Sequence, residues 1–413
     1  MVQMIARSKY IKQAEAFAAW LQTFVVENFL LVGFCGAVLF AFIYPFGGKL
    51  FYSWQTGDYR IIELLNNCFV FFISGLTLKL EDLKTVTKHK YPVLYSLVTI
   101  NFVTTLLSFG IIRLPLLTKD FAIGLTIFCT VPTTLGVGVA LTLLAKGDQI
   151  MSLFLTVVSN LLGIVTVPFL LGIYLSGTSA INIDPVKLAM KMTITVLVPT
   201  VIGMITRKSI AAVPAFTKTY RTELSMISTF NLVMIVWMAL SSARNNLLAQ
   251  NVGDVLFVLL VAVVMHVVFL VINAVMVSQY ILNFEPRQAV SVIIMASQKS
   301  SPVALAVITS LATDTPEQKG LFALPCIIGQ LSQIFIGSFI ASRLAKWVEQ
   351  KENELVSVDD VLETGVELIE QQQVNDDDNI ENESSNATHS KCEDSGEIAR
   401  AVQLGIVDDN NCL

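Results

Sequence analysis

Long stretches without a charged residue dominate the chain and decide its fold class. Examples are Tyr91–Ile112, Gln149–Ile183 and Val255–Phe284. Because about 20 apolar residues cross the hydrocarbon core of a bilayer, each stretch predicts a transmembrane helix. Two shorter runs, Leu64–Leu78 and Met192–Thr206, reach that length only with flanking charged side chains that snorkel to the interface. The pattern predicts ten spans, at roughly residues 29–46, 62–78, 92–113, 121–144, 151–175, 188–206, 225–243, 252–281, 288–312 and 321–345.

The composition agrees with an all-α polytopic membrane protein and argues against other classes. Hydrophobic residues make up 54% of the chain and charged residues only 14%. The six cysteines stand singly. The sequence contains no metal-ligand cluster, no nucleophile–base set and no phosphate-binding loop, so we predict neither an enzyme nor a bound cofactor. It also lacks the basic soluble domain that nucleic-acid binding requires.

Charge divides the chain into three parts. Residues 1–28 form an N-terminal segment, residues 29–345 contain the spans, and residues 346–413 form an acidic tail. The tail has no apolar periodicity, so we expect it to be disordered, as a solubilising or partner-binding segment. With the N-terminus in the cytosol, the loops on that side carry about twice as many Lys and Arg residues as the other loops. We therefore predict that both termini are cytosolic.

Two interrupted segments occupy corresponding positions in the two halves of the chain. Ten spans divide into five plus five, and halves with an odd number of spans have opposite orientations, as in inverted-repeat transporters. The fourth span reads "TVPTTLGVGVAL" (Thr130–Leu141) and the ninth reads "SQKSSPVALA" (Ser297–Ala306). Such paired interruptions indicate a central binding site. The alternative is that Pro132 and Pro302 only kink ordinary membrane helices.

Several motifs resemble the bile acid:sodium symporter family. They are "GLTLKLEDL" (Gly75–Leu83), "PTTLGVGVALTLLAKGD" (Pro132–Asp148), "SNLLGIVTVPFLL" (Ser159–Leu171), "QKS" in span nine and "GQLSQIFIGS" (Gly329–Ser338). They resemble most closely the seventh-member branch of solute carrier family ten, which includes fungal relatives implicated in restraining calcium entry. The resemblance covers roughly residues 29–345 and leaves out the tail.

The resemblance implies a fold and a place for the binding site. Spans one, two, six and seven would form a panel, and spans three to five and eight to ten would form a core. Spans four and nine would be broken and would cross inside the core, with solute and sodium bound near the crossing. Alternating access would move the panel relative to the core.

The sodium ligands that the resemblance implies are only partly present. In span five they fall on Ser152 and Thr156. In span four they fall near Gly136–Val139, which offers no side-chain oxygen, and in span nine the acidic ligand falls on Ile294. Where the family has an asparagine after its glutamine, this chain has Lys299. These replacements argue against sodium coupling, although Ser152 and Thr156 leave a residual sodium site open.

Lys299 suggests a different arrangement, in which a fixed ammonium replaces the coupling cation. It would lie among the hydroxyls of Thr133, Thr134, Ser300 and Ser301. There it would hold the crossing together, attract an anionic solute or exchange a proton. A charge at the membrane centre costs about 2.5–3.5 kcal/mol on insertion scales, so we expect it to have a role. The alternative is a structural lysine that donates to carbonyls freed near Pro302.

Three amide side chains complete the predicted site. Gln298 precedes the lysine, Asn101 lies in span three and Gln333 lies in span ten. Asn160 and His266 are interpreted instead as packing residues inside the helix bundle, where interhelical hydrogen bonds are common.

Two functions fit these features. The first is a secondary carrier of a small, anionic organic solute. The second is a non-enzymatic regulator of cellular calcium entry that acts on a calcium channel, through the acidic tail. Either would reside in the plasma membrane or in a membrane of the secretory pathway, with the lipid bilayer as its permanent partner.

Overall fold

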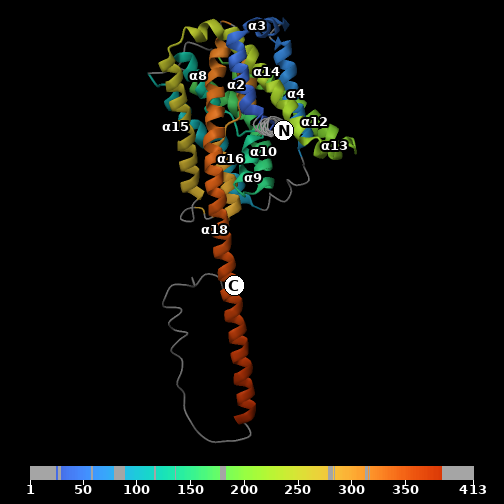
Figure 1. The fold of residues 1–413 in the computed structure, drawn as a ribbon, viewed down its shortest axis with the longest axis vertical. Helices are drawn as coiled ribbons and strands as arrows, with labels where there is room; N and C mark the ends of the chain where they lie inside the picture. Colours follow the sequence, from blue (N-terminus) through green and yellow to red (C-terminus); the bar gives the residue numbers. More distant parts are fainter. Residues whose placement is uncertain are drawn as a thin grey trace, which may run out of the picture. The chain divides into compact units, whose positions relative to one another are not determined.

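The computed structural model describes residues 25–26, 29–56, 59–78, 89–115, 118–134, 136–176, 183–277, 282, 284–311, 315 and 317–383, with side chains described as far as residue 354. The chain divides into two compact units, Met1–Lys351 and Glu352–Leu413. The first unit is a bundle of helices, seen in Figure 1. Of the second unit, the structure describes a helical backbone as far as Glu383.

Helices account for almost all of the described structure, which confirms the all-α fold class. The only strands among the described residues are β1 (Gln55–Thr56) and β2 (Tyr59–Arg60), which form a short antiparallel hairpin. The helices are α2 (Phe29–Ile43), α3 (Pro45–Ser53), α4 (Ile61–Thr77), α6 (Lys90–Val98), η1 (Thr99–Val103), η2 (Thr104–Leu107), α7 (Ser108–Ile111), α8 (Lys119–Thr130), α9 (Val137–Leu144), α10 (Gln149–Tyr174), α11 (Pro185–Met192), η3 (Thr193–Leu197), α12 (Val198–Ser209), α13 (Val213–Thr219), α14 (Arg221–Leu248), α15 (Val252–Val277), α16 (Pro286–Ser297), α17 (Ser301–Ser310) and α18 (Gln318–Glu383).

Seven helices of the described chain are long and apolar enough to cross a membrane. The other three expected spans coincide with shorter helices. These are α2, which has 15 residues and meets α3 at a bend of 96°; α4, which has 17 residues; and the pair α8 and α9. The bend falls at Pro45, in the first turn of α3, because proline cannot continue the preceding helix. The count of ten spans stays a prediction.

The outward faces of the spans match a lipid environment. Large apolar side chains such as Leu260, Phe335 and Phe339 are exposed on them. In contrast, 89% of the most apolar window of Pro286–Ser310 is buried inside the bundle. A helix surrounded by other helices can carry polar groups at membrane depth, because neighbouring helices supply hydrogen-bond partners.

One set of helices packs closely around α4. This helix contacts α12 and α14, and α14 in turn contacts α2 and α3. The α4–α12 contact depends on two glycines. A Cβ atom at Gly75 would lie 2.1 Å from the carbonyl oxygen of Thr200, and one at Gly203 would lie 2.3 Å from that of Phe72. Only glycine allows the two backbones to approach this closely.

A second set surrounds the broken helices. Here α16 contacts α6, α9, α10 and α15, and α17 contacts α8. The long helix α18 joins this set, since a Cβ atom at Gly124 of α8 would lie 2.4 Å from the carbonyl oxygen of Phe322. The assignment of these two sets to the expected panel and core stays a prediction.

The acidic tail differs from its expected structure in the part that is described. Composition predicts no regular structure for residues 346–413, whereas the backbone of α18 is helical through Glu383. Elongation of an existing helix needs no new nucleus, and the Glu, Gln, Lys and Leu residues of this stretch are good helix formers. Residues 384–413 and most of the N-terminal segment, residues 1–24 and 27–28, lie outside the described residues.

Candidate functional site

Both predicted helix breaks are present and lie against each other. The helical conformation stops after Thr130 and resumes at Val137, and it stops again after Ser297 and resumes at Ser301. Pro302 lies in the first turn of α17, where backbone N–H groups have no acceptor within the helix. The missing N–H of proline therefore costs nothing there, and Pro302 starts this half-helix and does not kink it.

Hydrogen bonds join the two breaks directly. The backbone N–H of Ser300 donates to the carbonyl of Pro132 at 3.0 Å, and the Thr133 hydroxyl donates to the carbonyl of Met295 at 2.6 Å. Thr134 is buried beside them. The Ser300 hydroxyl caps α17 by accepting from the backbone N–H of Val303. The two breaks thus supply hydrogen-bond partners for some of each other's backbone groups. Irregular segments at membrane depth need such partners, because the lipid offers none.

Lys299 is fully buried, and its ammonium points towards the third predicted span. Nζ donates to the carbonyl oxygen of Ile100 at 3.2 Å and to Oγ1 of Thr104 at 2.9 Å. It also lies 5.6 Å from the ring centre of Phe269. Within the described part of the chain, no carboxylate lies within ion-pair distance of it. The ammonium is therefore held by neutral dipoles and an aromatic ring.

These partners differ from those expected from the sequence. The hydroxyls of Thr133, Thr134, Ser300 and Ser301 lie at the breaks, but the ammonium makes its hydrogen bonds to a different helix. The reason is local geometry. The helix from Lys90 to Ile111 contains a π turn, η1, that contacts α16 and includes the carbonyl that the lysine reaches. Such π turns frequently mark functional sites in helices, but sequence periodicity does not reveal them.

Glutamines from α18 hold the backbone of the ninth-span break and of the first residue after it. Oε1 of Gln333 accepts the backbone N–H of Lys299 at 3.0 Å. Oε1 of Gln330 accepts both the N–H and the hydroxyl of Ser301, at 3.2 and 2.8 Å. Gln298 donates to the carbonyl of Gln333 at 3.4 Å. Gln333 was predicted from the sequence, whereas Gln330, one turn before it on the same helix, was not.

Asn101 is not connected to the other predicted residues by a described hydrogen bond. Its amide donates to the carbonyl of Leu97 in its own helix, and its Oδ1 is buried without a described partner. Oε1 of Gln298 is likewise buried without a partner among the described residues. Both oxygens are therefore unused acceptors close to the breaks, in elements that contact each other.

Three hydroxyl residues of α10, spaced i, i+4 and i+7, lie on one face of the helix. Ser152, Thr156 and Ser159 are all buried. Their hydroxyls bond mainly within the helix: Ser152 donates to the carbonyl of Asp148 at 3.0 Å, and Thr156 donates to that of Ser152 at 2.8 Å. Thr156 also lies 3.5 Å from the carbonyl of Thr134 in the fourth-span break. Of the three hydroxyls, that of Thr156 reaches the break, and all three already have partners in the protein.

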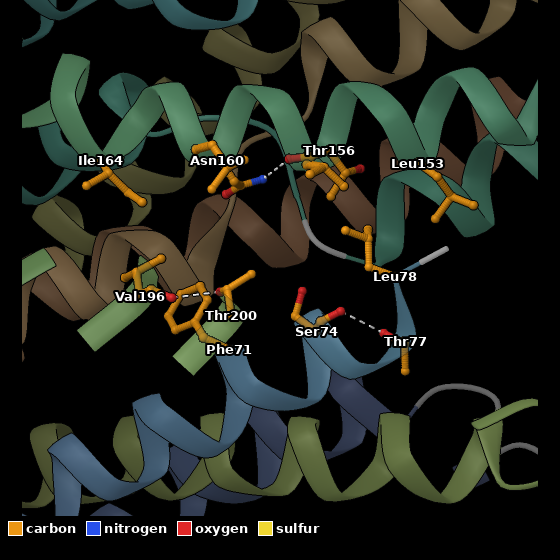
Figure 2. A pocket seen from close by; sticks show the side chains of 12 residues that line it. Phe71, Ser74, Thr77, Leu78, Leu153, Thr156, Asn160, Ile164, Val196 and Thr200 are labelled. Atoms are coloured by element: carbon orange, nitrogen blue, oxygen red, sulfur yellow. Dashed lines mark hydrogen bonds between the residues drawn. The ribbon is translucent and has the colours of Figure 1, made fainter. Parts of the chain in front are cut away.

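A cavity of about 70 Å³ lies between the two sets of helices. Figure 2 shows α10 along one side of it and α4 along the other. Five polar residues line it, namely Ser74, Thr77, Thr156, Asn160 and Thr200. The remaining lining is apolar: Phe71, Leu78, Leu153, Val157, Leu161, Ile164 and Val196. No charged side chain is among these lining residues, and Lys299 does not reach the cavity.

Sequence reasoning found only one of the five polar lining residues, Thr156. Asn160 was interpreted as a packing residue, although it lies one turn after Thr156 and so on the same face of α10. Ser74, Thr77 and Thr200 gave no signal, because single hydroxyl residues in apolar helices are common and their direction depends on how the helices pack.

Comparison with known proteins gives consistent matches. The sequence profile of the SBF-like CPA transporter family matches residues 27–346. A protein of Arabidopsis thaliana named "Probable sodium/metabolite cotransporter BASS4, chloroplastic" is 32% identical over 333 residues, which are 79% of this chain and 74% of that protein. The Oryza sativa subsp. indica protein of the same name is 28% identical over 354 residues, 83% of this chain and 81% of that protein. "Sodium/bile acid cotransporter 7" of Rattus norvegicus is 24% identical over 290 residues, 68% of this chain and 83% of that protein.

Proposed function

Because the chain belongs to the SBF-like CPA transporter family, which is the bile acid:sodium symporter family, we propose that it carries a small organic solute by alternating access. The family consists of membrane transporters and not of enzymes. The observation that carries the proposal is the cavity between α4, α12 and α10, which lies where a panel and a core would separate. The proposal includes the ten-span inverted repeat, with α8–α9 and α16–α17 as its two broken spans.

The two ends of α4 support a two-state mechanism. Its last residues line the cavity, whereas its first turns are closed against the other helix set. Asn67 donates to the hydroxyl of Thr309 at 3.3 Å, and Lys319 donates to the carbonyl of the same residue at 2.7 Å. Glu63 is buried close to Lys319. A carrier of this kind is closed on one side while it is open on the other, and with cytosolic termini the open side faces the cytosol.

For coupling, we propose that the ammonium of Lys299 serves as a fixed positive charge in place of a bound cation. The relatives are named as sodium cotransporters, but the position of the family's acidic ligand is occupied here by Ile294. The carbonyls of Pro132 and Met295 at the breaks already accept hydrogen bonds from the protein. A sodium ion needs several oxygen ligands, and a fixed ammonium close to them opposes its binding.

Uptake into proteoliposomes tests this function. The purified full chain is reconstituted and offered a panel of small metabolites, with the sodium and proton gradients varied separately. We expect saturable uptake of at least one solute that is independent of the sodium gradient and falls about tenfold or more in Lys299→Ala. A dependence on the proton gradient that is lost in the same variant would assign proton exchange to the lysine. Sodium-dependent uptake that survives Lys299→Ala would refute the fixed-charge proposal and favour a residual site at Ser152 and Thr156.

A further inference from the structure

The three threonine hydroxyls of the cavity already donate their hydrogens to hydrogen bonds within the protein. Thr77, Thr156 and Thr200 each donate to the carbonyl four residues earlier in the same helix, at 3.0, 2.8 and 2.7 Å. Figure 2 draws the bond of Thr200 along its own helix. A hydroxyl has one hydrogen and two lone pairs, so each of these groups meets a solute as a hydrogen-bond acceptor.

Asn160 is a hydrogen-bond acceptor for the same reason, since its donor hydrogens are already used. Its amide nitrogen donates to the carbonyls of Thr156, at 2.6 Å, and Thr133, at 3.1 Å. Because both partners are carbonyl oxygens, the amide group must direct its NH₂ towards them, and both of its hydrogens are used. Its Oδ1 is left without a partner among the described residues. A buried unpaired acceptor is costly unless a ligand supplies the missing donor.

The electrostatics of the cavity also favour a solute with hydrogen-bond donors over an anion. None of its lining residues is charged. Thr77 and Leu78 are the last residue of α4 and its C-terminal cap, so the negative end of this helix dipole lies at the cavity wall. Ser74 is the one lining hydroxyl with no described side-chain hydrogen bond, and it can donate or accept. A carboxylate or sulfonate would meet four acceptors here and no fixed positive charge.

We propose that this cavity binds a small solute that presents hydroxyl or amine donors and carries no anionic group. The inference rests on the proposed transport function and replaces the anionic solute expected from the sequence. The size fits a short molecule, since the volume of about 70 Å³ is several times the roughly 10–15 Å³ that one enclosed water needs. The apolar side chains around the acceptors, such as Phe71 and Val196, would cover its carbon skeleton.

Three probes of equal chain length separate the possible solute classes. Erythritol, putrescine and succinate each have four carbons, and they offer neutral hydroxyls, protonated amines and carboxylates. Val157→Cys places a reporter thiol in the cavity lining without removing an acceptor, in a full-length chain whose Cys35, Cys68, Cys392 and Cys412 are replaced by serine. Protection of this thiol from a maleimide measures occupancy. We expect erythritol, putrescine or both to protect it, and succinate to give no protection.

A matched pair of variants ties the protection to the acceptors. Thr200→Val removes one acceptor oxygen from the cavity and keeps the side-chain shape. Thr206→Val removes a hydroxyl from the same helix with the same intrahelical bond, but outside the cavity lining. We expect the probe concentration for half protection to rise about two- to tenfold in Thr200→Val, the range for one neutral hydrogen bond, and to stay unchanged in Thr206→Val.

Failure of the donor-solute inference can be distinguished from failure of the proposed carrier function. Protection by succinate, equal protection by all three probes, or protection by none of them overturns the donor-solute inference. Protection by erythritol or putrescine without uptake of either into proteoliposomes would leave that inference standing and count against the proposed carrier function. Uptake of succinate that is reduced by Thr156→Val would support the proposed carrier function and overturn the donor-solute inference.

Discussion

The position of Lys299 allows two interpretations, a structural role and a functional role, which predict opposite effects of the lysine on the stability of the fold. Its ammonium is fully buried and bonded to the carbonyl of Ile100 and the hydroxyl of Thr104, with no described carboxylate in reach. Removal of a charged group from water costs several kcal/mol, and two neutral acceptors offset only part of this. As a structural clamp, the lysine would have to stabilise the fold. As a working charge, it is retained although it destabilises the fold.

Lys299→Met separates these readings, because methionine has a similar length and carries no charge. We expect the unfolding temperature in detergent to stay the same or to rise, since replacement of a buried charge by an apolar group of similar volume is often neutral or stabilising. Uptake of the transported solute should fall at least about tenfold. A drop of several degrees in the unfolding temperature, with uptake reduced only in proportion to folded protein, would show that the lysine is structural.

At the scale of elements, the cavity depends on how closely α4 and α12 approach. Gly75 faces the carbonyl of Thr200, and Thr200 lines the cavity one helix away. The glycine therefore determines both the helix spacing and the position of an acceptor. A methyl group at this position cannot be accommodated by a rotamer change, because the atom that it would meet belongs to the backbone.

Gly75→Ala is therefore expected to displace α12 and to cost about 1–3 kcal/mol of stability, the usual cost of overpacking. Uptake should fall further than the loss of folded protein explains, because Thr200 moves with the helix. Gly36→Ala is the control: Gly36 is on α2, and a Cβ atom there would meet nothing within 4 Å. That variant should keep its uptake and gain up to about 1 kcal/mol from helix propensity. Equal behaviour of the two variants in thermal unfolding would contradict this account.

At the scale of the whole molecule, the sequence predicted what hydrophobic pattern and motifs encode. The helical class, both breaks and the family follow from long apolar runs and from stretches such as Pro132–Asp148. The contacts of Lys299 and the cavity lining did not follow, because they depend on a π turn and on the rotation of α4 and α12. A single sequence also gives no measure of which hydroxyls bond within their own helix. Thr156 was found, whereas Thr200 was not.

The division of the chain at Lys351 allows a test of the calcium-regulating alternative. The family match ends at residue 346, and every residue of the breaks and the cavity lies before that point. Deletion of Glu352–Leu413 should therefore leave solute uptake within about twofold of the full chain, since the shortened chain keeps the whole family domain and every residue of the breaks and the cavity. If the protein also restrains calcium entry through its acidic tail, the same deletion should raise cytosolic calcium in cells, measured with a fluorescent indicator. Lys299→Ala should then abolish uptake and leave calcium unchanged. A parallel loss of both activities in either variant would mean that regulation and transport share one site, and that the tail is not an independent regulatory segment.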